Sequence, residues 1–223
     1  MNHLLAIDTS TPACSVALLS NTKRFEAFET KASKHTEILL PMIESLLQQA
    51  HLKPHELEGI IISIGPGAFT GLRVGASVAM GLAYGAGAKL LPISSLALQA
   101  QTAMRLTGQS FIISTLDARM DEIYAGIYQH GKALSPDTLL SPKALWQRWQ
   151  TDYAEALIVG SGLHYPPFNQ SALPTDAATL VPQAVDAFDW LQQNPTDALW
   201  QSPSNGLILN YLRNDVVDKP KIS

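Results

Sequence analysis

The first candidate for chemistry is a polar cluster near the start of the chain. Asp8, Thr9, Ser10 and Thr11 come directly after a short apolar run. At the end of a strand, these side chains could hold a metal-bound nucleotide phosphate, with Asp117 as a facing carboxylate. Asp, Ser and Thr are equally typical of an ordinary turn, so the pattern leaves both interpretations open.

A glycine-rich segment is the strongest signal in the sequence. Residues 65–73 read GPGAFTGLR and stand between a strand-like apolar run and a helical pattern. Backbone N–H groups in such a setting hold phosphate groups. However, the segment lacks the Lys-Ser/Thr pair of a P-loop, and Thr70 stands where a dinucleotide-binding fingerprint has its third glycine. Neither nucleotide-binding motif is therefore predicted.

Other side chains are candidates for a metal site or a nucleophile. His51 and His55 have the spacing of a helical metal pair, but Pro54 argues against a regular helix, so we expect an exposed turn. Cys14 has no nearby histidine to form a thiolate and is expected in the core. His35 begins an apolar helix face and is expected to be a core or capping residue. No Ser-His-Asp or Cys-His arrangement supports a peptidase.

The elements that position these residues follow from the hydrophobic periodicity. The first thirty residues predict a three-stranded antiparallel meander. Further strands are expected at 59–64, 89–93, 111–116 and 122–129, and helices at about 33–50, 69–84 and 95–105. Ser33 or Thr36 is expected to cap the first helix, and Ser94-Ser95 the third. Residues 136–206 have weak periodicity, and the order of their elements is not predicted.

The second helix has an unusual surface. No residue between Arg73 and Lys89 is charged, but the segment is shorter than the about 20 residues that a membrane span needs. Its small residues recur every four positions, at Gly71, Gly75, Ala79 and Ala83. Such a stripe lets another helix approach closely, and apolar residues cover the other sides. Core and partner interface remain equally open interpretations.

The composition limits the class of protein. The 223 residues suffice for one large domain or two compact ones, and 46% hydrophobic with 15% charged residues predicts a folded core. A net charge of −4 without a Lys/Arg run argues against a protein that binds nucleic acid by itself. The single cysteine excludes a disulfide scaffold, and the first residues lack the basic region of a secretory signal. A cytoplasmic protein is expected.

Several segments together resemble the TsaB (YeaZ) family. They are residues 5–10, 34–37, 65–75, 92–96, 117–119, 122–124 and 211–214. The resemblance is close over residues 4–130 and in the tail, and loose over 131–206. It implies an α/β, actin-like ATPase (ASKHA, ribonuclease H-like) fold with two lobes, each built on a mixed sheet flanked by helices. Residues 1–104 with 207–223 would form the N-terminal lobe with the dimerisation helices, and 105–206 the smaller C-terminal lobe.

The resemblance also implies a function. In this family the protein is the non-catalytic partner and activator of the transferase TsaD, which places a threonylcarbamoyl group on N6 of adenosine 37 in tRNA. A TsaE-like ATPase works with them, the subunit alone forms a homodimer, and tRNA is reached only through the complex. No membrane contact and no intrinsic cofactor are expected, and any ATP or ADP is expected at the interface with the partner.

Two positions support a non-catalytic role. The catalytic relative carries a His-x-x-x-His metal pair after the equivalent strand. Aligned on Pro92-Ile93, those places fall on Ser95 and Gln99. Neither side chain is a competent ligand for iron or zinc at neutral pH. We therefore expect no catalytic residue and no metal ligand in this chain.

The partner surface is expected on the first two helices of the N-terminal lobe. The expected contact residues are His35, Ile38, Leu39, Met42, Leu46, Phe69, Leu72, Arg73, Gly75, Ala76, Ala79 and Met80. On this hypothesis Gly75→Leu breaks association and leaves the protomer folded. The rival hypothesis is a stand-alone actin-like ATPase or kinase that uses Asp8, Thr11 and Asp117. Otherwise residues 8–11 and Asp117 are a possible remnant of a nucleotide site.

Overall fold

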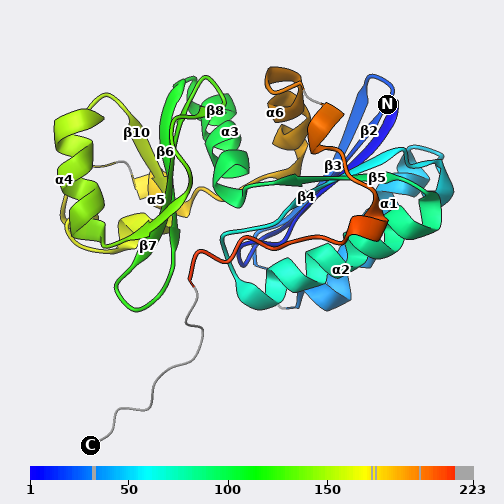
Figure 1. The fold of residues 1–223 in the computed structure, drawn as a ribbon, viewed down its shortest axis with the longest axis horizontal. Coiled ribbons are helices and arrows are strands. Elements are labelled where there is room, and N and C mark those ends of the chain that lie inside the picture. Colours follow the sequence, from blue (N-terminus) through cyan, green and yellow to red (C-terminus); the bar gives the residue numbers. More distant parts are fainter. Residues whose placement is uncertain (32–33, 172, 174, 196, 214–223) are drawn as a thin grey trace, which may run out of the picture.

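The computed structural model describes residues 1–31, 34–171, 173, 175–195 and 197–213. Two mixed sheets lie side by side, with one helix, α3, between them (Figure 1). The first sheet has the order β3 (Lys23–Glu29), β2 (Cys14–Ser20), β1 (His3–Asp8), β4 (Gly59–Ser63) and β5 (Lys89–Ile93). The second has the order β10 (Leu157–Gly160), β6 (Phe111–Asp117), β7 (Ile123–Gln129) and β8 (Lys132–Ala133), and β9 (Thr138–Leu140) also pairs with β7.

The first sheet contains the expected meander. Strands β1, β2 and β3 pair antiparallel, whereas β4 and β5 join them in parallel beyond β1. All five residues of β4 are buried, because helices cover both faces of the sheet there. This explains why the apolar run of β4 shows no alternation.

The helices separate the core into two layers. Helices α1 (His35–Gln49) and α2 (Phe69–Ala86) pack on one face of the first sheet, with Leu5, Ile7 and Ile60. Helix α3 (Ser95–Thr107) packs on the other face and also contacts β6 and β7. The remaining helices are α4 (Pro142–Asp152), α5 (Thr175–Thr179) and α6 (Ala187–Gln193). None of the helices described here is long and apolar enough to cross a membrane.

The expected helix ends are confirmed in part. Ser94 caps α3, since its Oγ accepts hydrogen bonds from the N–H groups of Leu96 and Ala97. Helix α1 begins at His35, and its N-cap, Lys34, makes no side-chain capping bond, so the expectation for Thr36 was wrong. Ser33 lies outside the described residues. His51 and His55 are exposed in a turn region, and Cys14 is fully buried, both as expected.

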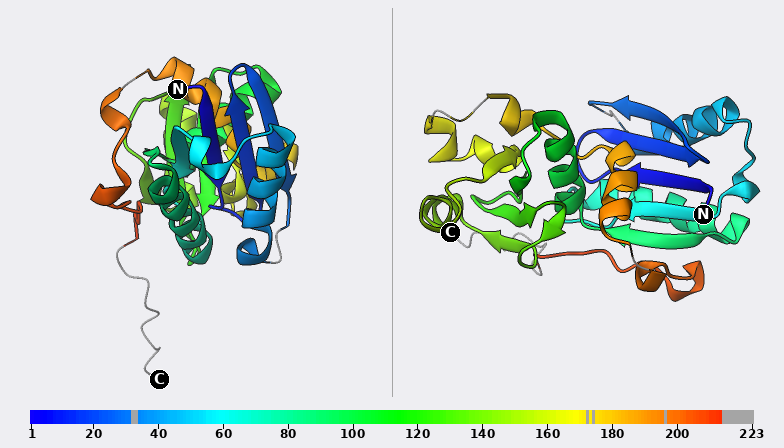
Figure 2. Two further views of the ribbon diagram at one scale, coloured as in Figure 1. Left: turned by 90° about the vertical axis from the view of Figure 1, so that its right-hand side faces the viewer. Right: turned by 90° about the horizontal axis from the view of Figure 1, so that it is seen from above.

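A late segment of the chain returns to the first sheet. The 3₁₀ helix η4 (Ala184–Asp186) contacts β1, β2 and β3, and the N–H of Ala184 donates to Ser15 Oγ at 2.8 Å. Arg24 on β3 forms two hydrogen bonds to Asp189 on α6. In Figure 2, α6 lies beside the strands of the first sheet. The division into lobes at residue 104 stays a prediction.

The small-residue stripe of α2 faces the interior. Gly71, Gly75, Ala79 and Ala83 are all buried. A Cβ atom at Gly71 would run into the carbonyl oxygen of Thr9, and one at Gly75 into its Oγ1. The missing side chains at Gly71 and Gly75 therefore leave room for the loop after β1. The expectation that the stripe sets the approach of a partner helix was wrong.

Candidate functional site

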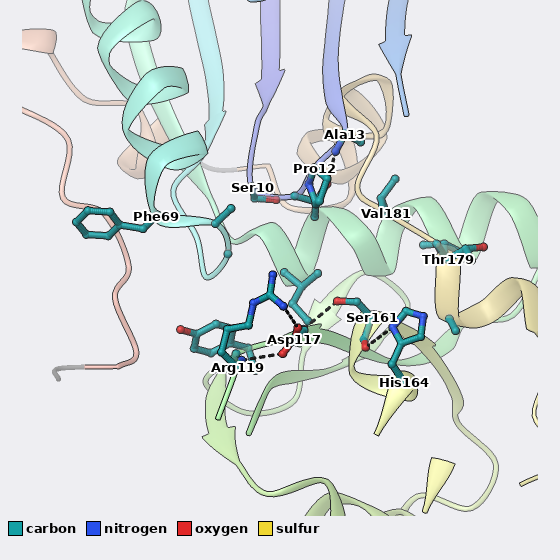
Figure 3. A pocket seen from close by; sticks show the side chains of 18 of the residues that line it. Ser10, Pro12, Ala13, Phe69, Asp117, Arg119, Ser161, His164, Thr179 and Val181 are labelled. Carbon is teal, nitrogen blue, oxygen red and sulfur yellow. Dashed lines mark hydrogen bonds and ion pairs between the residues drawn. The ribbon is translucent and has the colours of Figure 1, made fainter. Parts of the chain in front are cut away.

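A cavity of about 730 Å³ lies between the two sheets. The loop after β1 and the start of α2 line it from the first sheet, and the end of β6 and residues 161–164 line it from the second (Figure 3). Residues 178–181 and the segment 210–213 complete the wall. Segments that are far apart in sequence therefore meet around one space.

The structure divides the predicted nucleotide-site residues into two groups. Ser10, Thr11 and Asp117 line the cavity, whereas Asp8 and Thr9 do not. Thr9 is buried, and its Oγ1 donates to the carbonyl oxygen of Gly71 at 2.8 Å. Thr9 therefore ties β1 to α2 and does not face the cavity.

The Asp8 carboxylate is enclosed at the end of β1. Its side chain is 1% exposed and accepts hydrogen bonds from the N–H and Oγ of Ser10 and from Ser63 Oγ. Burial raises the pKa of Asp8 from 3.8 to about 6, although the serine hydrogen bonds oppose this shift. Asp8 thus holds the loop to β4 and does not face the cavity, which favours the turn interpretation over a phosphate or metal ligand.

Asp117 faces the cavity from the end of β6. Its carboxylate accepts hydrogen bonds from the N–H of Arg119 at 2.7 Å and from Tyr165 Oη at 2.8 Å, and the Arg119 guanidinium lies 3.2 Å away. Figure 3 shows Asp117 and Arg119 on the side of the second sheet, opposite Ser10. Asp117 is therefore already paired with a cation of its own loop.

A serine and a histidine beside Asp117 do not form a catalytic relay. Ser161 Oγ accepts a hydrogen bond from the N–H of Asp117, and His164 Nδ1 lies 2.9 Å from the carbonyl oxygen of Ser161. A nucleophilic serine needs its hydroxyl on the imidazole and the carboxylate on the other ring nitrogen. This geometry does not support a peptidase.

Sequence reasoning missed the cations of the cavity. Lys31, Arg119 and Arg213 line it, from three separate parts of the chain. Arg213 donates to Glu122 Oε2 at 2.5 Å and to the carbonyl oxygen of Arg119 at 3.2 Å. The segment 207–213 thus runs from the first sheet to the β6–β7 loop (Figure 1). Its resemblance to the family's tail was the one signal that pointed to it.

Ser95 and Gln99 are both buried in α3. The Gln99 side chain donates from Nε2 to the carbonyl oxygen of Leu180 at 2.7 Å and accepts from Ser114 Oγ at 2.5 Å. Neither residue lines the cavity. Gln99 therefore joins α3 to β6 and to the 178–181 segment.

The expected partner-contact residues also divide by burial. Leu39, Leu46, Leu72, Gly75, Ala76 and Ala79 are buried within the protomer, so they are core residues and their assignment to a partner surface was wrong. His35, Ile38, Met42 and Met80 are half-buried, and Phe69 and Arg73 are exposed. The outward side of α2 instead presents Thr70, Ser77 and Gly81. Among the described residues, no atom lies within 4 Å of a Cβ placed at Gly81 or Gly85.

Comparison with known proteins gives consistent matches. The family model described as tRNA N6-adenosine threonylcarbamoyltransferase (TsaD) matches residues 29–145. The tRNA threonylcarbamoyladenosine biosynthesis protein TsaB of Haemophilus influenzae is 34% identical, over 97% of this chain and 95% of its own length. The chain belongs to the TsaB family. TsaB of Escherichia coli K12 is also 34% identical, over 82% of this chain and 83% of its own length.

Solved structures agree with this family. A crystal structure titled as an uncharacterized protein with similarity to peptidase YeaZ, from Pseudomonas aeruginosa, has a TM-score of 0.84 at 34% identity and covers 96% of this chain and all of its own. YeaZ from the same organism has a TM-score of 0.81 at 32% identity, over 95% of this chain and all of its own. The expected α/β class, with two mixed sheets flanked by helices, is confirmed.

Proposed function

We propose that this chain is the accessory subunit of a complex that forms threonylcarbamoyladenosine in tRNA, and that it binds and activates a TsaD-like catalytic subunit. TsaB relatives named for this biosynthesis support the pathway. The enclosure of Asp8 is the observation that carries the non-catalytic role. In this proposal the chemistry belongs to the partner.

The enclosed carboxylate removes the central group of a phosphate site. A metal-bound phosphate at this strand end needs a carboxylate that the metal ion can reach. Asp8 is instead surrounded by the hydroxyls of Ser10 and Ser63, and Gln99 is engaged in hydrogen bonds at the place of a metal ligand. Any ATP or ADP in the complex is accordingly assigned to the interface with the partner.

The outward side of α2 is the surface proposed to take the partner. Thr70, Ser77 and Gly81 lie along it, Tyr84 is 65% exposed beside them, and the helix carries no charge after Arg73. Interface cores are depleted of charged residues, and outward glycines let a helix approach closely. In the absence of the TsaD-like subunit, a second copy of this chain occupies the same surface. A TsaE-like ATPase and tRNA join through the complex.

The association is tested by adding bulk to this surface. Gly81→Leu places a large side chain where nothing contacts it in the protomer, so the variant should fold and lose the TsaD-like subunit in size-exclusion chromatography. Ala144→Leu, at an exposed position of α4 in the second lobe, is the matched control and should bind like the wild type. Co-elution of Gly81→Leu with the partner would contradict the proposed surface.

The stand-alone ATPase or kinase is kept as a second candidate because Ser10, Thr11 and Asp117 line one cavity. It predicts ATP turnover by the pure protein that is lost in Asp117→Ala. The proposed accessory role predicts no turnover by the pure wild-type protein.

A further inference from the structure

Arg73 lies on the exposed side of α2, one turn after the helix begins. Its Cζ lies 3.7 Å from the ring centroid of Phe69, and its Nε donates to Tyr211 Oη at 3.2 Å. The Phe69 and Tyr211 rings are themselves 5.5 Å apart. Two aromatic residues, from α2 and from the segment 207–213, therefore fix the position of the guanidinium.

The fixed guanidinium still has donors to offer. Among the residues described, none accepts a hydrogen bond from its two terminal nitrogens and no carboxylate forms an ion pair with it. Those nitrogens are the part of an arginine that binds a carboxylate with two parallel hydrogen bonds. A side chain that is already ordered loses less conformational entropy on binding.

Helix α2 carries no acidic residue that could pair with Arg73. Helix α2 has no acidic residue in its first turn and no side-chain cap. Among the residues that the structure describes, the Phe69 ring and Tyr211 Oη hold the guanidinium, and no carboxylate pairs with it.

We propose that Arg73 is the charged anchor of the α2 surface and takes an aspartate or glutamate side chain of the TsaD-like subunit. This inference rests on the proposed function. Charge complementarity indicates the partner's chemistry: α2 offers one cation that no described carboxylate pairs with, at the edge of an otherwise uncharged face. The matching surface is a helix face that is apolar or small at its centre and carries a carboxylate at its edge.

The test is a titration of the full-length protein with the TsaD-like subunit by isothermal calorimetry. Arg73→Glu should weaken the complex by about tenfold or more, because it places like charges opposite each other. Arg73→Met, which keeps contact with Phe69, should weaken it less and reduce its salt dependence. Lys89→Glu makes the same change of net charge beyond the end of α2 and should leave the affinity within about twofold of wild type.

Exchanging the charges of the two proposed partners identifies the carboxylate that pairs with Arg73. Replacing the partner's carboxylates one at a time by arginine should restore binding of Arg73→Glu at one position only. A structural role of Arg73 would not give such rescue. Equal affinity of Arg73→Glu and wild type, or an equal loss in Lys89→Glu, would overturn the proposal.

Two further outcomes separate this inference from its alternatives. If Gly81→Leu abolishes binding and Arg73→Glu does not, the α2 surface takes the partner but Arg73 is not its anchor. If neither variant weakens binding, the partner binds elsewhere, whereas the accessory role itself fails only if tRNA modification does not depend on this protein. The tail holds Asp215 and Asp218. If a chain that ends at Arg213 no longer responds to Arg73→Glu, the carboxylate comes from this chain's own tail, which also overturns the proposal.

Discussion

The Asp8 carboxylate joins β1, β4 and the loop that leads to β2 through its serine partners. An ionised group in this position lacks water, and burial accordingly dominates its pKa. Sequence reasoning recognised Asp8 from its residue type and its place after a strand. It could not tell that Ser63, which is 55 positions away in the chain, encloses the carboxylate.

The raised pKa of Asp8 predicts a pH dependence of stability. Because this pKa is about 6 in the folded protein and 3.8 for an aspartate side chain in water, the folded state binds the proton more tightly between these values. The contribution of Asp8 to the free energy of unfolding is therefore fully present below about pH 4 and lost as the pH rises through about 6. Between pH 4 and pH 7, the free energy of unfolding of the wild type, measured in urea, should fall by up to about 3 kcal/mol relative to that of Asp8→Asn.

The comparison with Asp8→Asn cancels the titration of the other carboxylates, which both proteins share. Parallel stability curves for the two proteins across this range would show that Asp8 is not the titrating group.

The two faces of α2 have opposite roles, although the sequence makes them look alike. Gly71 and Gly75 meet the loop after β1 and Ala79 is buried in the core, whereas Ser77 and Gly81 are exposed. Periodicity predicted this helix and the strands on either side of it well. It could not orient the helix, because apolar residues surround it on every side and give no polar face to place in solvent.

Two leucine substitutions distinguish these faces. Gly75→Leu should lower the free energy of unfolding by at least about 2 kcal/mol, because its side chain meets Thr9 and Ile62 in a packed core. Gly81→Leu should leave it unchanged or raise it slightly, since leucine favours a helix over glycine. Urea unfolding of the isolated protein measures both. If Gly75→Leu is as stable as the wild type, the small-residue stripe is not packed in the core, and its interpretation as a partner surface would be favoured instead.

At the scale of the whole molecule, contacts join segments that are distant in sequence. Arg105 on α3 pairs with Asp186 at 2.5 Å, and Arg24 on β3 pairs with Asp189 at 2.6 Å. The segment 207–213 crosses to the β6–β7 loop and closes one side of the cavity. Lys31, Arg119 and Arg213 come from such segments, so local patterns could not gather them into one site.

These two ion pairs should differ in their effect on stability. Asp186 is fully buried and its Arg105 partner half-exposed, whereas both members of the Arg24–Asp189 pair are about one-third exposed. Asp186→Ala should cost about 3 kcal/mol of unfolding free energy, and Asp189→Ala about 1 kcal/mol or less. Thermal and urea unfolding of the two variants provide the comparison. Equal losses would mean that burial does not set the strength of these contacts.

The accessory role is tested most directly by reconstituting tRNA modification. A TsaD-like subunit, a TsaE-like ATPase, threonylcarbamoyl-adenylate and tRNA are assayed for modified adenosine with this protein present, omitted, or replaced by Gly81→Leu. We predict modification that depends on the wild-type protein and is lost with the variant. Equal modification when the protein is omitted would contradict the role as an activator and direct attention to ATP turnover in the cavity.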